Sequence, residues 1–163
     1  MCQESLFFEQ VSTQWDDMRS SFYNADIIDA LAERGRVSST STVVDVGTGT
    51  GFIAAGLAGW VAHVIGVDNS TATRWDLPMT ASTSRSRTWC CTNAPDPVEM
   101  LAEMARVVRP GGVIAIADEI EHHYEWMRTE QADLWLGFTP RAVRTFFDQA
   151  RLVEYSYSSL SMQ

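Results

Sequence analysis

The sequence predicts an α/β fold in which a mostly parallel sheet carries helices on both faces, truncated in the middle and at its C-terminal strand. Two apolar, β-branched runs, residues 42–46 and 63–67, are separated by a stretch of small, helix-forming residues. A third run, 113–118, is almost entirely apolar, which is typical of a strand covered on both faces. Strand, helix and strand in this order predict a parallel pair joined by a right-handed crossover.

The composition predicts one domain spanning residues 1–163. Of these residues 45% are hydrophobic and 20% are charged, which are ordinary values for a chain that buries a single core. A net charge of −9 argues against nucleic acid as a partner, because nucleic-acid binding requires a basic face. No apolar run approaches the roughly 20 residues of a membrane span, and the N-terminus lacks the features of a signal peptide. We therefore expect a cytoplasmic protein that does not bind membranes.

The three cysteines are interpreted as free thiols. Cys2, Cys90 and Cys91 are odd in number, and their spacing fits neither a disulfide scaffold nor a metal site.

Two helices are expected before the first strand. Within residues 5–23, apolar side chains recur at nearly helical spacing: Phe7, Val11, Trp15, Met18 and Phe22. Residues 24–35 predict a second helix that ends at Gly35. We assign residues 1–36 to an N-terminal helical part and residues 42–163 to the core that contains the sheet.

Two further helices and two strands are expected downstream. Asp96 and Pro97 predict the capped start of a helix, which a Pro-Gly-Gly sequence ends before the strand at 113–118. Thr139 predicts the start of the last helix, and a final strand is expected within 151–160.

The loop between the first strand and its helix is the candidate ligand site. Gly47, Gly49 and Gly51 leave the backbone N–H groups and the amino end of the helix open to a polar ligand, because no Cβ atoms obstruct them. Asp45 precedes the loop, and Asp68 ends the next strand, where a carboxylate can accept both hydroxyls of a ribose. Alternatively, the glycines serve only a tight turn, or the Gly-x-Gly-x-x-Ala pattern beginning at Gly49 belongs to a dinucleotide-binding domain.

Three sequence blocks, in this order, resemble those of the class I S-adenosylmethionine-dependent methyltransferases. They are DVGTGTG at residues 45–51, GVDNS at 66–70 and APDPVEMLAEMARVVRPGGVIAIAD at 94–118. The chain is most similar to the type 11 methyltransferases grouped with quinone-biosynthesis enzymes and to the methyltransferase halves fused to ArsR-like repressors. This resemblance covers residues 7 to about 160, and it implies a Rossmann-like fold, S-adenosylmethionine as cofactor and a small-molecule methyl acceptor.

The resemblance also assigns roles to residues around the loop. It implies that Asp45 and the loop position the methionine part of the cofactor, that Asp68 holds the ribose hydroxyls, and that Asn69 flanks the adenine. The cofactor-binding set implied in this way is Asp45, Gly47, Thr48, Gly49, Gly51, Asp68, Asn69 and Asp76. It implies neither a metal nor a nameable catalytic residue.

The same comparison extends to the flanking segments. Asp76 matches the end of the family's third-strand loop, whereas the acid expected to contact the adenine is replaced by Thr73. Residues 1–36 correspond to a helical lid over the cofactor, and residues 42–163 to the Rossmann-like core.

The region after the third apolar run holds two histidines and several aromatic residues. His122 and His123 could ligate a metal or act as bases, but no third ligand has suitable spacing, so we interpret them as solvated loop residues. Three aromatic residues either shape an apolar substrate pocket or belong to the core: Trp126, Trp135 and Phe138.

The stretch between Asp68 and Asp96 is too short for the part of the fold that it should contain. A helix, a strand, a second helix and a fourth strand need roughly 45 to 50 residues, about twice what residues 69–95 provide. Within it, residues 79–93 read MTASTSRSRTWCCTN, which has no acidic residue and differs from a buried strand. One interpretation is a polar surface loop.

The genetic code offers another interpretation of this segment. If each codon is read from the last base of one codon and the first two of the next, the junction after Met79 must encode Asp and that after Trp89 must encode Val. With permitted choices of the free bases, the shifted stretch reads DDSVDVAFANMVLH before HAPDP, which resembles the family's fourth strand. We therefore hypothesise that residues 79–93 are translated out of frame, with the frame restored before Ala94.

The sequence thus predicts a methyltransferase that acts on a small molecule and is impaired by the loss of residues after Asp68. The alternatives are a non-catalytic remnant of a methyltransferase and an NAD-type binding domain. The sequence makes no prediction of the oligomeric state.

Overall fold

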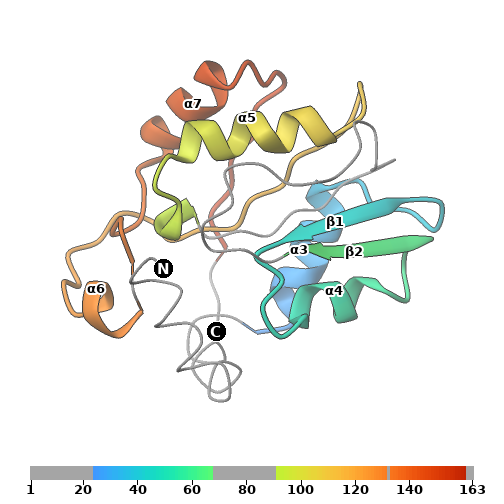
Figure 1. Cartoon of the computed structure of the whole chain (residues 1–163), viewed down its shortest axis with the longest axis horizontal. Coiled ribbons are helices and arrows are strands. Elements are labelled where there is room, and N and C mark those ends of the chain that lie inside the picture. The colour runs from blue at the N-terminus through green and yellow to red at the C-terminus, as the bar shows by residue number, and fades with distance from the viewer. Residues whose placement is uncertain (1–23, 68–90, 132, 161–163) are drawn as a thin grey trace.

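The computed structural model describes residues 24–67, 91–131 and 133–160 (Figure 1). In chain order these contain α3 (Asp26–Arg34), β1 (Thr42–Val46), α4 (Phe52–Leu57), β2 (His63–Val67), the 3₁₀ helix η1 (Cys91–Asn93), α5 (Pro97–Val107), α6 (Met127–Glu130) and α7 (Pro140–Gln149). The helix expected within residues 5–23 and most of the unusual 79–93 segment lie outside the described residues.

The strands β1 and β2 form a parallel pair. Their register runs from Thr42 opposite His63 to Val46 opposite Val67, and α4 makes the connection between them. Both strands coincide with the apolar runs in the sequence, and this confirms the predicted strand, helix and strand unit. β1 is the more deeply buried of the two, since four of its five residues are buried.

Two apolar clusters lie on opposite faces of β1. Val43 packs with residues of α3 and α4, whereas Val44 and Val46 pack with residues of α5. Figure 1 shows α4 on one side of the strand pair and α5 with α7 on the other. The predicted arrangement, a parallel sheet with helices on both faces, is therefore confirmed.

The helix boundaries follow the local sequence signals. The Asp96 carboxylate accepts hydrogen bonds from the backbone N–H groups of Val98 and Glu99 at 2.9 and 3.0 Å, and Pro97 occupies the first helical position of α5. Thr139 caps α7 in the same way, and α3 ends at Gly35 as predicted. Within the described part of the chain, no helix has the length and apolar character needed to cross a membrane.

The run at 113–118 is not a hydrogen-bonded strand, which corrects the prediction. Its side chains nevertheless alternate between the two clusters: Ala115 and Ala117 join the cluster of α3 and α4, and Ile114 and Ile116 join that of α5. The apolar pattern thus determined the packing. The described sheet contains only β1 and β2, paired with each other, so the run makes no ladder with either strand.

The final strand predicted within 151–160 is also absent. Arg151 and Glu154 adopt positive φ angles of 59° and 58°, which interrupt extended backbone. Only Leu152 of this segment packs against the cluster of α5, while Val153 is 84% exposed. The apolar residues here do not form a buried face, so a strand gains no packing energy.

Candidate functional site

The loop that follows β1 has the backbone conformation that only glycine adopts easily. Gly47, Gly49 and Gly51 have φ angles of 70°, 49° and 86°, all in the left-handed region. A Cβ atom built on Gly51 meets no heavy atom within 4 Å, so the backbone conformation, not a lack of space, favours glycine there. The predicted glycine loop is therefore present between β1 and α4.

Hydrogen bonds fix this loop to the end of β2. The N–H groups of Gly47 and Thr48 both donate to the carbonyl oxygen of Val67, at 2.8 and 3.2 Å. These two N–H groups are therefore bonded within the protein and are not available to a ligand. The sequence had predicted that the N–H groups of the whole loop face a ligand, and this prediction does not hold for Gly47 and Thr48. The six residues of α4 are also too few for its amino end to carry the site alone.

The Asp45 carboxylate lies beneath the loop. It is 2% exposed, and its Oδ2 atom accepts a hydrogen bond of 2.9 Å from the hydroxyl of Thr48. In the parallel register Asp45 lies opposite Gly66 of β2. A Cβ atom on Gly66 would lie 3.0 Å from Thr48 Oγ1 and 3.1 Å from Thr48 Cγ2. The Thr48 side chain therefore lies next to the place that a side chain of residue 66 would occupy.

The structure brings together five of the residues predicted to bind the cofactor: Asp45, Gly47, Thr48, Gly49 and Gly51. The other three, Asp68, Asn69 and Asp76, lie outside the described residues, and their roles stay predictions. Sequence reasoning missed Gly66. A glycine inside a strand is a signal of close approach by another group, and here that group is Thr48.

A second group of polar residues lies after the apolar run at 113–118. His122 is not the solvated loop residue that was expected, because its Nε2 atom lies 2.8 Å from Glu119 Oε2 and its side chain is only 14% exposed. The backbone N–H of Tyr124 donates to His122 Nδ1, at 3.2 Å. In the neutral imidazole, Nε2–H can then donate to Glu119 while Nδ1 accepts. His123 is exposed, as expected.

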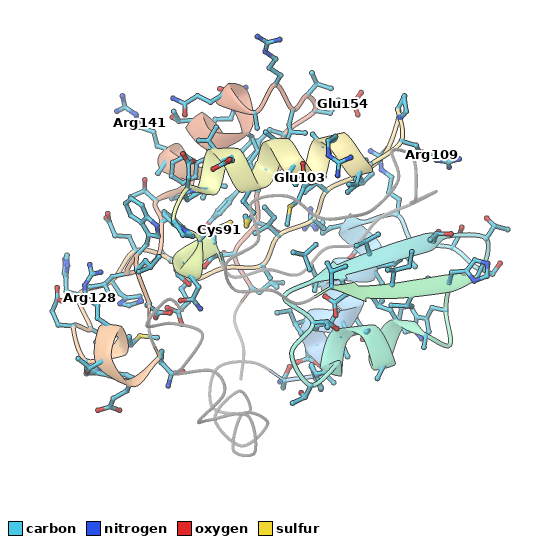
Figure 2. All side chains as sticks on the ribbon, viewed as in Figure 1. Cys91, Glu103, Arg109, Arg128, Arg141 and Glu154 are labelled. Atoms are coloured by element: carbon cyan, nitrogen blue, oxygen red, sulfur yellow. The ribbon has the colours of Figure 1, made fainter. Side chains whose placement is uncertain are left out.

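Burial raises the pKa of two groups here. The pKa of Asp133 rises to about 7, first because the carboxyl is desolvated and then because Glu119 and Asp118 lie nearby. The free thiol of Cys91 is buried below α5 (Figure 2), and desolvation followed by the charge of Asp118 raises its pKa well above the usual value. A buried thiol with a raised pKa is a poor nucleophile. Cys2 and Cys90 lie outside the described residues.

The aromatic residues of this region divide between core and surface. Phe138 is buried and packs edge-on against Phe146, with ring centroids 5.3 Å apart. Trp126 and Trp135 are 45% and 42% exposed, and the indole N–H of Trp135 donates to the carbonyl oxygen of Ala94 at 2.8 Å. Phe138 is thus a core residue, whereas the two tryptophans present part of their rings to solvent.

No metal centre is formed by the residues that the structure describes. Within residues 24–67, 91–131 and 133–160, no group of three or more His, Cys, Asp and Glu side chains could hold a metal ion.

Comparisons with known proteins give one sequence match and several structural matches. No protein-family model matches the chain. The chain is 44% identical to the probable methyltransferase ltbC of Aspergillus luteorubrus over a stretch of 50 residues. This stretch covers 30% of the length of this chain and 18% of the length of that protein. The match therefore spans less than a fifth of the length of this relative.

Two solved structures have the same fold as this chain at low sequence identity. One, from the complex between the Haloferax volcanii Trm112 methyltransferase activator and a methyltransferase, superposes with a TM-score of 0.70 at 17% identity, over 88% of this chain and 75% of that one. The other, an S-adenosylmethionine-dependent methyltransferase from Aquifex aeolicus, gives a TM-score of 0.57 at 18% identity, over 78% and 88% of the two chains.

Proposed function

We propose, from the premise that this chain has the fold of the class I S-adenosylmethionine-dependent methyltransferases, that it binds S-adenosylmethionine at the loop after β1. The observation that carries the proposal is the conformation of this loop. Three glycines with positive φ angles follow a buried strand, and the loop is fixed to the end of β2, directly before Asp68 in the sequence.

The residues present fit this cofactor. Asp45 supplies a carboxylate at the base of the loop, suited to the ammonium group of the methionine part, and Asp68 supplies an acceptor pair for the ribose. When bound, the cofactor supplies an electrophilic methyl group on a sulfonium. Because such a transfer depends mainly on alignment, the chain's contribution is to hold the donor and to exclude misaligned acceptors. We assign no residue as a base.

The acceptor that we propose is a small molecule. The net charge of −9 disfavours nucleic acid as substrate or partner. We also propose a cytoplasmic protein without a membrane partner, because no apolar run of the sequence approaches the length of a membrane span. We further propose that methyl transfer is impaired, because residues 69–95 are too few for the helices and strands that the fold requires there. This shortening also favours the second candidate, a non-catalytic remnant that retains cofactor binding.

Titration calorimetry with S-adenosylhomocysteine and with NAD tests the cofactor assignment. We expect S-adenosylhomocysteine to bind more tightly. Asp68→Ala should weaken its binding by about 1.5 to 3 kcal/mol, roughly 10- to 150-fold, because charge-assisted hydrogen bonds to the ribose are lost.

Asp29→Ala is the matched control, since Asp29 is an exposed acid on α3. Its affinity should equal that of the unmodified chain. Equal affinities for the two ligands, or a preference for NAD, would contradict the methyltransferase assignment. An Asp68→Ala affinity that is unchanged would place the ribose site elsewhere.

A further inference from the structure

Three residues from different parts of the chain meet at the base of the glycine loop. Asp45 lies in β1, Gly66 lies opposite it in β2, and Thr48 is contributed by the loop. The missing side chain of Gly66 leaves room on β2, and the Thr48 side chain lies over that position, with its Cβ atom 3.3 Å from where a Gly66 Cβ would be. From there its hydroxyl reaches the Asp45 carboxylate.

We propose that Thr48 is a positioning residue of the cofactor site: its hydroxyl holds the Asp45 carboxylate in place. We also propose that residue 66 of β2 is glycine because a larger side chain would displace the Thr48 side chain. The proposal rests on the proposed function, because it concerns the orientation of the acid assigned to the cofactor. In this role Thr48 acts through Asp45, whereas the sequence resemblance had implied that it binds the cofactor directly.

The chemistry of Asp45 explains why such a partner is needed. A carboxylate that is 2% exposed is costly to bury unless hydrogen bonds compensate the lost water. The 2.9 Å bond from Thr48 is one of these bonds, and it fixes which oxygen turns toward the loop. Hydrogen bonds from a neutral donor to an ionised acceptor are among the stronger hydrogen bonds in proteins.

The shape of threonine suits this task. Its β-branch restricts χ1, so the hydroxyl is held toward Asp45 without a further loss of side-chain entropy. The methyl group on the same branch lies 3.1 Å from the position of a Gly66 Cβ, and it fills the gap beside the strand. The backbone N–H of Thr48 is bonded to Val67, so the residue is fixed at both its main chain and its side chain.

The test is the affinity of the full chain for S-adenosylhomocysteine, measured by calorimetry. Thr48→Val keeps the shape but removes the hydroxyl, and we expect about tenfold weaker binding. Thr48→Ser keeps the hydroxyl and should restore the affinity to within about threefold. In an Asp45→Ala background, which removes the acceptor, Thr48→Val should have a much smaller effect, because the two residues act as one unit.

The role of Gly66 is tested by adding a methyl group. Gly66→Ala should weaken binding, since the new Cβ would lie 3.0 Å from Thr48 Oγ1 and displace the hydroxyl. The same change in a Thr48→Ala background should have little further effect. Gly59→Ala is the control, because a Cβ there meets nothing within 4 Å and the backbone φ is ordinary.

The outcomes separate this proposal from the proposed function. If the unmodified, folded chain does not bind S-adenosylhomocysteine, both are overturned. If it binds and Thr48→Val binds equally well, or if Thr48→Ser is as weak as Thr48→Val, the positioning role alone is overturned. Thermal unfolding of each variant identifies any that do not fold, and if Thr48→Val is one, the Thr48→Ser and Gly66→Ala results decide.

Discussion

Asp133 is a buried carboxyl whose ionisation affects the stability of the folded chain. Burial disfavours its charged form first, the charges of Glu119 and Asp118 disfavour it further, and His122 and Arg128 partly compensate. Its pKa of about 7 in the folded chain lies above its ordinary value of 3.8. The folded state therefore binds a proton more tightly than the unfolded state, and this carboxyl makes stability fall as the pH rises from about 4 to about 7.

Asp133→Asn should remove this dependence. Asn remains neutral, so relative to the unmodified chain the variant should gain stability between about pH 4 and pH 7, by at most about 4 kcal/mol. Urea unfolding at a series of pH values measures the effect. Asp29→Asn, at an exposed position, should leave the slope unchanged. If the free energy of unfolding of Asp133→Asn and of the unmodified chain changes equally with pH, the raised pKa of Asp133 is contradicted.

At the same scale, the sequence revealed part of the candidate site. Asp45 and the loop glycines could be identified because their spacing and their position after an apolar strand are local features. The contact between Thr48 and Gly66 could not, since it depends on the register between two strands. The partial burial of His122 was also missed, because Glu119 becomes its partner only through the fold of the backbone between them.

At the scale of the element, signals that act within a few residues were reliable. The caps of α5 and α7 were predicted at Asp96 and Thr139, where a side chain bonds the first helical N–H groups. Among the described residues, the two strands that were correctly predicted are those that pair with each other, β1 and β2. The run at 113–118 has the alternating burial of a strand, but apolar character alone does not supply a hydrogen-bonding partner.

The segment 79–93 gives a prediction that coding DNA can check. If it is an out-of-frame strand, the Thr83 codon should end in G to give Val, the Arg85 codon in T to give Phe, and the Thr88 codon in A to give Met. The protein sequence leaves these bases undetermined, so agreement at all three would be improbable for a true polar loop. Sequencing the coding region decides the matter. Disagreement at two or more positions would mean that the shifted frame does not encode a buried strand.

At the scale of the whole molecule, the fold class was predictable because the order of apolar runs and helices fixes a parallel, two-sided arrangement. Substrate choice was not, since no local pattern in the sequence identifies an acceptor. Two partly exposed tryptophans, Trp126 and Trp135, follow the apolar run at 113–118 in the sequence. An exposed indole ring can contact many kinds of ligand, so these residues do not identify the acceptor.

We expect the full chain to show little or no methyl transfer. Residues 69–95 are fewer than the helices and strands of this fold need there, and methyl transfer depends on the alignment that a complete cleft provides. Incubation with radiolabelled S-adenosylmethionine and a panel of small-molecule acceptors measures this, with an active methyltransferase as the positive control. A chain whose 79–93 segment is replaced by the shifted-frame residues should still show weak methyl transfer, because the shortening that we propose after Asp68 would be a separate loss. Measurable turnover by the present chain would refute this expectation.

The way β1 is shared between the two apolar clusters determines how the chain loses its structure. Val43 packs in one cluster, and Val44 and Val46 pack in the other, so this five-residue strand contributes side chains to both clusters. If the helices on either side come apart, β1 is exposed and the opposite cluster loses the side chains of this strand as well. We therefore expect the two clusters to unfold together, as one cooperative unit.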